Sequence, residues 1–428
     1  MYSERNFIRS IKLRIPPVFR LASISLVLLL ILSACSSPAA YNLPTAQGNV
    51  QTGLDRFIRS YADDYSGKKA VLITNHSGVN RDLVLNIKLL RENGINVTMV
   101  LSPEHGLYGY ENDYDSRTFY TDVSMNTIVY NLHNLSDKSL GFLLNSADFV
   151  MYDIQDMGMR CYTYISNLKW IMDAMNGTGK ELIVLDRPNP IGFLGTDGPP
   201  LEKNFTTKFI SSFPAPFIYN MTMGEAARYY RGECERTVNL RVIKMNNYRR
   251  DMLYSETGLP WVPPSPNLPT YGSSIIYTAI VYLEGVNISL GRGTTKPFEY
   301  IGAPWIEPVK FCKDLSRLGL HNFMFRPVRF MPTFSVYKNR SCGGAHIFYT
   351  GGKFSPTEAA YRIIRYIMNT YPEAKWTSRG SYHTIDALAG TDRMRKCIGE
   401  NKTYDDFLDE QKPGLRKYAR ARRKYLLY

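Results

Sequence analysis

The stretch "KAVLIT", residues 69–74, and the polar "NHSG" that follows it, residues 75–78, decide the predicted fold. A short run of aliphatic and β-branched side chains, closed by turn-forming residues, predicts a buried strand. The next apolar run, residues 95–101, ends in the same manner in "SPEHG", residues 102–106, and residues 83–93 between the two runs have helical spacing. A strand, a helix and a second strand in this order predict a parallel pair with a crossover helix.

The same alternation continues along the first half of the chain. Apolar runs at residues 127–132, 149–153 and 182–186 predict three more strands, and residues 163–179 predict the helix before the last of them. Strands that alternate with helices favour a parallel sheet covered on both faces. We therefore predict an α/β fold with a doubly wound, mainly parallel sheet.

Polar motifs follow four of the predicted strands. They are residues 75–78, 102–106, 153–160 ("DIQDMGMR") and 186–190 ("DRPNP"). In a doubly wound sheet, ligands bind outside the carboxyl ends of the strands, where these motifs would meet. Several carboxylates, histidine and two arginines at one sheet edge indicate a functional site rather than four independent turns.

The Pro-rich segment "WVPPSPNLPT", residues 261–270, marks a change of character, because proline continues neither a helix nor a central strand. We place the main domain at residues 53–265 and a smaller α/β domain, which completes the cleft, at residues 266–428. In the smaller domain, residues 346–349 predict a strand and residues 356–371 predict a helix.

The N-terminal residues have the features of an export signal. Five basic residues precede the apolar run 24–32, which is too short to span a bilayer comfortably. The run ends in Leu32-Ser33-Ala34-Cys35, which resembles a bacterial lipobox. Residues 1–34 are therefore expected to be removed, Cys35 to be lipidated and residues 35–52 to form a tether. The expected location is the exported side of a membrane.

The formal net charge is +14 at pH 7, and seven basic residues with no acid lie between Lys412 and Lys424. In an exported protein such a segment favours lipid headgroups or an anionic cell-wall polymer over nucleic acid. The alternative is a solvated helix face, followed by the apolar end "YLLY", residues 425–428, packed on the core. The five cysteines after Cys35 are odd in number and widely spaced, which does not indicate a disulfide framework.

Several chemistries lack their motifs. There is no G-x-G-x-x-G after the first strand, no phosphate-binding loop, no H-E-x-x-H, no C-x-x-C pair and no G-x-S-x-G. We therefore expect neither a cofactor nor a metal. Carboxylates are abundant instead, and glycoside hydrolysis needs one carboxyl as acid and a second group as nucleophile or base. Glu104 follows an apolar strand and Pro103, and apolar surroundings favour the protonated form that an acid catalyst needs.

A series of motifs resembles the exo-β-N-acetylmuramidase family called NamZ. The motifs are "LITNHSG" (72–78), "SPEHG" (102–106), "DIQDMGMRCYTYIS" (153–166), "LDRPNPIG" (185–192), "WVPPSPNLPT" (261–270), "EGVNISLGRGTTKPFEYIGAPW" (284–305) and "YLLY" (425–428). The resemblance implies a Rossmann-like N-terminal domain and a smaller C-terminal domain. It also implies that the protein releases terminal β-N-acetylmuramic acid from the non-reducing end of peptidoglycan fragments.

The resemblance puts the family's proposed catalytic glutamate on Glu104 and leaves its partner open. N-Acetylmuramic acid carries a lactyl carboxylate, for which Arg160 and Arg292 are the expected clamps, because a guanidinium binds a carboxylate bidentately. The predicted catalytic residues are Glu104, His105, Asp153 and Asp156. The predicted substrate-binding residues are Asn75, Arg160, Tyr164, Asp186, Asn267, Arg292 and Glu299.

Two other functions stay open at this point. A non-catalytic lipoprotein could bind cell-wall glycans with the same cleft and basic segment. An amidase or deacetylase acting on the same polymer would need a metal cluster or a nucleophile, for which Cys161 is the candidate. The chain departs from the family pattern at residues 107–114 and 219–222, which affects the choice of substrate but leaves Glu104 in place.

Overall fold

The computed structural model describes residues 49–111 and 117–428, and all of these belong to one compact unit. The predicted leader, Cys35 and most of the predicted tether lie outside the described residues. The last residues of that tether are packed on the fold. Val50 is buried, Gln51 pairs with Asn246, and Thr52 caps the first described helix.

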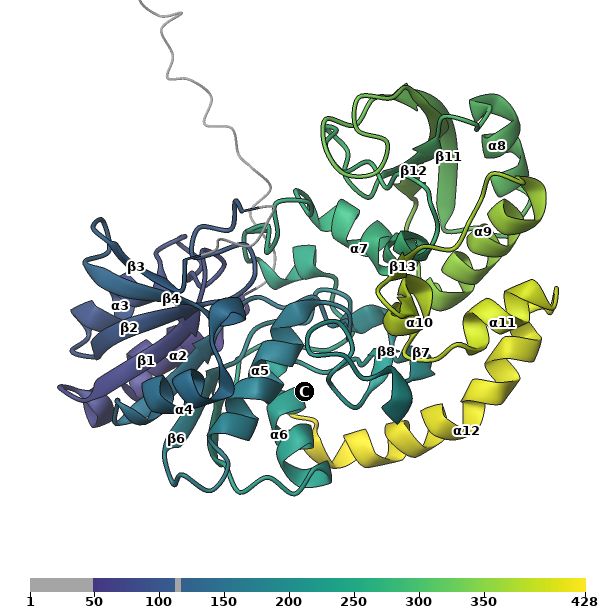
Figure 1. The fold of residues 1–428 in the computed structure, drawn as a ribbon. Coiled ribbons are helices and arrows are strands. Elements are labelled where there is room, and N and C mark those ends of the chain that lie inside the picture. Colours follow the sequence, from purple (N-terminus) through teal and green to yellow (C-terminus); the bar gives the residue numbers. More distant parts are fainter. Residues whose placement is uncertain (1–48, 112–116) are drawn as a thin grey trace, which may run out of the picture. The chain divides into compact units, whose positions relative to one another are not determined.

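The main sheet has seven strands in the order β3-β4-β2-β1-β5-β6-β9 (Figure 1). Their bounds are β1 Lys69–Thr74, β2 Asn96–Ser102, β3 Phe119–Asp122, β4 Thr127–Asn131, β5 Phe149–Asp153, β6 Glu181–Leu185 and β9 Asn239–Ile243. Neighbouring strands are parallel, except that β3 runs antiparallel to β4 at one edge. The predicted doubly wound, mainly parallel sheet is confirmed, and the predicted strand at residues 69–74 has those bounds.

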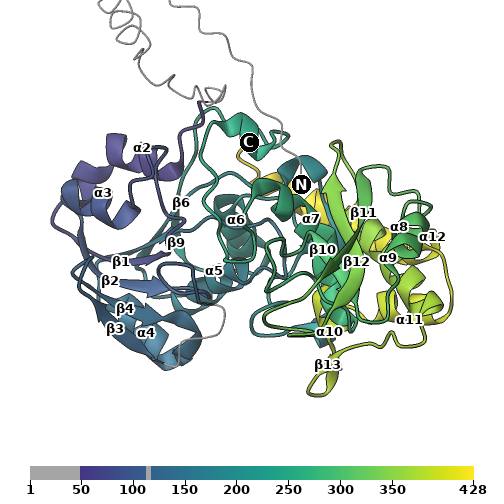
Figure 2. The same cartoon turned by 90° about the horizontal axis from the view of Figure 1, so that it is seen from above.

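Side chains of β1 alternate between two cores, one on each face of the sheet. Ala70 and Leu72 pack with α2 and α3, whereas Val71 and Ile73 pack with α4, α5 and α6. These helices are α2 Gly53–Ser60, α3 Asn86–Glu92, α4 Asp137–Asn145, α5 Thr163–Ala174 and α6 Met223–Glu233. Figure 2 shows α2 and α3 on one side of the sheet and α4 and α5 on the other. Because both faces are buried, polar side chains gather at the strand ends.

The helix predicted at residues 163–179 ends earlier than the pattern indicates. Its last residue is Ala174, and the chain turns into β6 through Gly177 and Gly179, which both have positive φ. Glycine adopts this conformation without the steric cost that a side chain brings, so the two glycines end the helix.

A smaller sheet follows the Pro-rich segment. It has the antiparallel order β10-β12-β11 and packs with α7 and α8, and α9 packs with α7. The bounds are β10 Tyr300–Ala303, β11 Phe323–Phe330, β12 Cys342–Tyr349, α7 Tyr271–Ile280, α8 Pro308–Leu315 and α9 Pro356–Thr370. Two further strand pairs are β7 Asp197–Pro200 with β8 Pro216–Ile218, and β13 Ser378–Arg379 with β14 Tyr382–His383. Three further α-helices are α10 Thr384–Ala389, α11 Arg393–Gly399 and α12 Tyr404–Arg422. The described part of the chain holds no helix with the length and apolarity needed to cross a membrane.

The C-terminal residues dock on the main domain. The Tyr428 hydroxyl donates a hydrogen bond to Asp186 Oδ2 (2.8 Å), and the backbone N–H of Leu427 donates to Glu225 Oε1 (2.6 Å). Arg250 donates to the carbonyl of Tyr428 (3.0 Å) and forms an ion pair with Glu225. The chain end "YLLY" is therefore docked on the main domain, and this docking does not test which partner the basic segment has.

A buried ion pair lies where the strand order reverses, between β1 and β5. Arg187 Nε donates to Asp153 Oδ1 (2.6 Å), Arg187 Nη2 donates to Asp153 Oδ2 (3.0 Å), and Asn86 donates to the same Oδ2 (2.8 Å). Asp153 is fully buried and Arg187 nearly so. The pair joins the loops after β5 and β6 in the interior of the protein.

We expect Arg187→Met to lower the free energy of unfolding by about 3–5 kcal/mol, because it leaves the Asp153 charge buried without its partner. Urea unfolding at pH 7 measures this change. The double variant Asp153→Leu/Arg187→Met removes both charges and should recover part of the loss. A loss below about 1 kcal/mol in the single variant would be typical of an exposed pair and would contradict this assignment.

Candidate active site

Glu104 lies just beyond the end of β2 and is half-buried. Its Oε2 accepts a hydrogen bond from the Thr163 hydroxyl (2.7 Å), and Thr163 is the first residue of α5. The backbone N–H groups at a helix N-terminus carry partial positive charge, which favours a carboxylate there. The end of β2 and the start of α5 therefore hold this carboxyl in a defined position.

The loop after Glu104 is closed by unusual backbone geometry. His105 and Gly106 both have φ +73°, a conformation that is uncommon for histidine. His105 Nδ1 lies 2.7 Å from the carbonyl oxygen of Glu111, and because a carbonyl only accepts, Nδ1 carries the proton. His105 therefore orders the loop through residue 111.

The same loop is tied to the Pro-rich segment through His76. A Cβ added to Gly109 would lie 1.8 Å from His76 Cε1, so only glycine allows the loop to approach this ring. His76 Nε2 donates to the carbonyl of Pro263 (2.6 Å), and its backbone N–H donates to the carbonyl of Leu107 (2.7 Å). The loops after β1 and β2 are thereby joined to residues 261–270.

Tyr164 forms a buried wall beside Glu104. Its hydroxyl donates to the carbonyl of Pro264 (2.6 Å) and accepts from Asn75 Nδ2 (3.0 Å), while Asn75 Oδ1 accepts from Ser77. Burial, with a smaller contribution from the Glu104 charge, raises the pKa of Tyr164 above its usual value. Asn75 therefore orients the tyrosine through Nδ2, while Ser77 holds the other end of its amide. Asn267 lies in the same Pro-rich segment and is buried.

A row of aromatic rings connects the two sheets. Tyr162 contacts Tyr164 edge-on with ring centroids 4.8 Å apart, and contacts Tyr277 of α7 at 6.4 Å. Tyr277 in turn contacts Phe298 at 4.6 Å, and the guanidinium of Arg292 lies 4.7 Å from the centre of the Phe298 ring. The row therefore leads from the wall beside Glu104 to Arg292.

Arg292 is paired with Glu284 and is partly exposed. Its Nη2 donates to Glu284 Oε1 (2.8 Å), and its side chain is 30% exposed. Burial opposes its charge, but Glu284 outweighs burial, with further contributions from Tyr277 and Glu104, so the pKa of Arg292 is raised. Arg292 is held rigidly by Glu284 and Phe298 and keeps part of its guanidinium accessible.

Three residues of this region were not among the predicted site residues: Thr163, His133 and Glu284. Thr163 and Glu284 lie inside motifs that the sequence singles out, which is the signal that could have found them. His133 lies outside every such motif. Burial lowers the pKa of His133 to about 4, even though the nearby Glu104 charge favours the protonated form. His133 is therefore a neutral imidazole close to Glu104.

Asp156 is buried in the interior. Its Oδ2 accepts from the Gly158 N–H (2.5 Å) and from the Tyr219 hydroxyl, whereas no hydrogen-bond donor in the described residues reaches its buried Oδ1. Burial raises the pKa of Asp156 to about 7, although these hydrogen bonds lower it. The charges of Asp156 and Glu104 both contribute to the raised pKa of Tyr164.

Arg160 is not available to a substrate, and its predicted clamp role is not compatible with its surroundings. The side chain is fully buried and donates to four backbone carbonyls. These carbonyls belong to Pro199 (3.0 Å), Ala215 (2.7 Å), Leu388 (3.1 Å) and Ala389 (2.6 Å). Arg160 therefore joins the loop after β5 to the β7–β8 pair and α10.

Three other predicted residues also have internal partners away from Glu104. Asp153 is held in the ion pair with Arg187. Asp186 accepts hydrogen bonds from Thr222, Gly224 and Tyr428, and Glu299 pairs with His346 and Lys296 beside the smaller sheet. Their contacts give them structural roles, so the structure gathers Glu104, His105, Asn75, Tyr164 and Arg292 but not these three.

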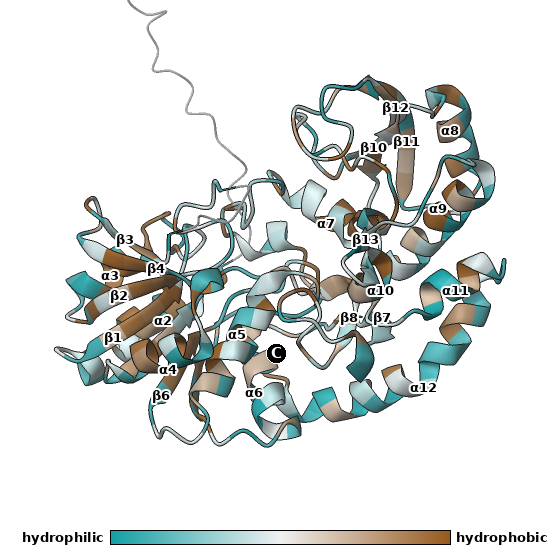
Figure 3. Ribbon diagram, viewed as in Figure 1, coloured by the Kyte–Doolittle hydropathy of each residue, from teal (hydrophilic) through white to brown (hydrophobic). Residues whose placement is uncertain are grey.

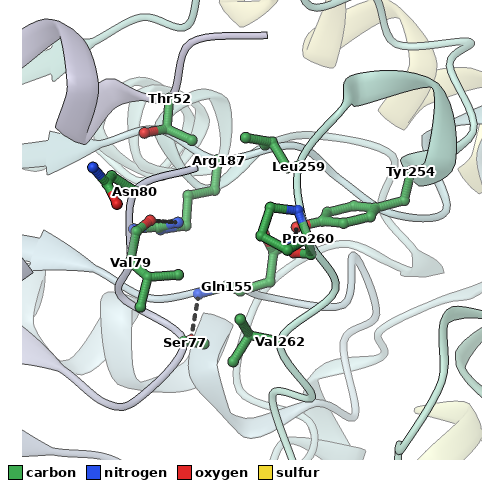
Figure 4. A pocket seen from close by; sticks show the side chains of 10 residues that line it. All are labelled: Thr52, Ser77, Val79, Asn80, Gln155, Arg187, Tyr254, Leu259, Pro260 and Val262. Atoms are coloured by element: carbon green, nitrogen blue, oxygen red, sulfur yellow. Dashed lines mark hydrogen bonds between the residues drawn. The ribbon is translucent and has the colours of Figure 1, made fainter. Parts of the chain in front are cut away.

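The crevice at the strand-order reversal is nearly filled. Figure 4 shows Ser77, Gln155 and Arg187, from the loops after β1, β5 and β6, facing Tyr254, Leu259, Pro260 and Val262. The cavity that they leave has a volume of about 10 Å³, room for about one water molecule. A nucleotide does not fit in this crevice, which is where many doubly wound proteins bind one.

Cys161 lacks the properties of a nucleophile. Burial raises the pKa of its thiol to about 12, and the thiolate is the reactive form. Within residues 49–111 and 117–428, no group of three or more His, Cys, Asp or Glu side chains is placed to hold a metal ion. The described cysteines are all free thiols.

Comparison with known proteins assigns the family. Residues 70–272 match the model of the N-terminal part of the exo-β-N-acetylmuramidase NamZ, and residues 275–428 match that of its C-terminal part. The peptidoglycan β-N-acetylmuramidase NamZ of Bacillus subtilis strain 168 is 37% identical over 401 residues, which cover 93% of this chain and 96% of that protein. Crystal structures of two DUF1343 family proteins from Bacteroides fragilis NCTC 9343 share the fold. One has a TM-score of 0.80 at 32% identity and the other 0.68 at 28%, each covering 89% of this chain and 99% of its own. The chain belongs to the NamZ family of exo-β-N-acetylmuramidases.

Proposed function

We propose that this protein is an exo-acting glycosidase that releases terminal β-N-acetylmuramic acid from the non-reducing end of peptidoglycan fragments. The family membership of both halves supports this reaction. The observation that carries the residue assignment is the carboxyl of Glu104, which Thr163 holds at the start of α5.

Glu104 is the proposed acid. As the glycosidic C–O bond breaks, negative charge develops on the leaving oxygen, and a proton delivered from a positioned carboxyl stabilises it. The Thr163 hydrogen bond fixes one carboxyl oxygen, while His105 and Asn75 position the loop and the tyrosine wall around it. His105 and Asn75 are thus positioning residues.

Arg292 is the proposed clamp for the lactyl carboxylate, which distinguishes N-acetylmuramic acid from N-acetylglucosamine. A planar guanidinium can donate two parallel hydrogen bonds to a carboxylate, and the ion pair with Glu284 keeps it oriented. Tyr164 and Asn267 are proposed to line the same subsite. Asp156 is proposed to act through the tyrosines rather than by touching the sugar.

The enzyme is also proposed to be an exported lipoprotein, anchored to a membrane through Cys35. The lipobox-like Leu32-Ser33-Ala34-Cys35 after the basic and apolar leader supports this location. Peptidoglycan lies outside the cytoplasm, so export would bring the enzyme to its substrate.

Glu104→Gln should reduce kcat on a chromogenic β-N-acetylmuramide by about 10²–10⁴-fold, because glutamine keeps the shape and the Thr163 contact but has no acidic proton. Thermal unfolding should stay close to wild type. Glu299→Gln is a matched control, since Glu299 pairs with His346 and Lys296, and its kcat should be near normal. Wild-type turnover by Glu104→Gln would refute the assignment.

Arg292→Met should weaken binding of N-acetylmuramic acid by roughly 10- to 100-fold, the cost of losing charged hydrogen bonds. Binding of N-acetylglucosamine, which has no lactyl group, should change little. Isothermal titration with both sugars measures the difference. An equal loss for both would show that Arg292 supports the cleft through Glu284 instead of recognising the lactyl group.

Asp156→Asn should change how stability depends on pH. Because the folded-state pKa of Asp156 is about 7, above the unfolded value near 4, the folded state binds the extra proton between these values. Its contribution to stability is full below pH 4 and is lost as the pH rises to 7. From pH 4.5 to 7.5, urea unfolding should therefore show the variant gaining about 3 kcal/mol relative to wild type. A constant difference would mean that Asp156 does not titrate in this range.

A further inference from the structure

We propose that the outward face of the C-terminal helix is a second contact surface for the polymeric substrate, binding carboxylate-bearing peptidoglycan strands away from the catalytic cleft. The surface, called the basic stripe here, consists of Arg416, Lys417, Arg420 and Arg423. All four side chains are exposed. This inference rests on the proposed function, because that function supplies the anionic polymer.

The four cations share one side of α12 and of the short 3-10 helix, Arg423–Tyr425, that continues it. Arg416, Arg420 and Arg423 have the spacing i, i+4 and i+7, which places them on one helix face with Lys417 at its border. The buried residues of α12 are Tyr404, Phe407, Gln411 and Tyr418. Their spacing puts them on the opposite face, so docking α12 on the core directs the cations to solvent.

The acidic residues of α12 do not neutralise these four charges. These acidic residues lie in the first half of the helix, where Asp409 pairs with Lys412, and Glu410 pairs with Arg393 and Lys402. In the described chain, none of the four stripe residues forms an ion pair with a carboxylate. Figure 3 shows the hydrophilic colour that prevails along α12. The basic stripe is therefore a positively charged surface that the described carboxylates do not neutralise.

Charge complementarity points to a polyanion. Muramoyl groups and peptide stems carry carboxylates that repeat along a peptidoglycan strand, and several exposed cations bind such an array additively. A bilayer is the less favoured partner, because the exposed large apolar side chains of the described residues all lie outside α12, so nothing there would enter the hydrocarbon. Holding the polymer would raise its local concentration around an enzyme that removes one sugar at a time.

The test is co-sedimentation with purified peptidoglycan sacculi stripped of secondary polymers. The variant R416Q/K417Q/R420Q/R423Q should bind at least about tenfold more weakly than wild type at low salt, because the interaction is electrostatic. Wild-type binding should fall in the same way when salt is raised. The kcat/KM on a soluble chromogenic β-N-acetylmuramide should be unchanged, which also shows that the variant is folded.

The matched control is K138Q/K203Q/K313Q/K375Q, which loses the same charge from four exposed lysines spread over other elements. This control should bind sacculi like wild type. Equal loss in both variants would assign the effect to net charge and overturn the proposal. Normal sacculus binding by the stripe variant, with lost binding to phosphatidylglycerol vesicles, would make the stripe a membrane surface and also overturn it. Binding needs no turnover, so a failure of the glycosidase assignment would appear separately, as inactivity of the wild type on the chromogenic muramide.

Discussion

The buried ion pair between Asp153 and Arg187 limits where this doubly wound fold can bind a ligand. It lies where the strand order reverses, which is the position that most proteins of this architecture give to a ligand. Here the pair and the Pro-rich segment close the crevice to about the volume of one water molecule. The carboxyl that the fold presents is instead one strand away, at the end of β2.

The site at β2 is assembled by contacts that cross from one part of the chain to another. The carbonyls of Pro263 and Pro264 accept from His76 and Tyr164, so a segment without regular structure holds the loop after β1 and the first turn of α5. The aromatic row from Tyr162 to Phe298 continues this connection to the smaller sheet. Arg292 owes its place to this row and to Glu284.

Two arginines that look equivalent in the sequence lie in different surroundings, and only Arg292 is proposed to bind substrate. Arg160 gives its hydrogen bonds to backbone carbonyls in the interior, where a guanidinium can satisfy several acceptors at once. Arg292, between two glycines, pairs with one carboxylate and remains partly exposed. The same chemistry that suits a guanidinium to a substrate carboxylate also suits it to joining distant loops, and burial decides between the two uses.

The sequence by itself determined the sheet, because the apolar runs of β1, β2 and β5 and their spacing leave few other arrangements. It also determined the position of Glu104, because a carboxyl that closely follows a buried strand emerges at the sheet edge. It also carried the family motifs. Tertiary structure decided which polar strand ends form a site and which hold the fold together. Asp153, Asp186 and Arg160 resemble site residues in a linear motif, and their internal partners, such as Tyr428 and Ala389, are distant in sequence. Pairings over such distances depend on chain packing, which local pattern does not contain.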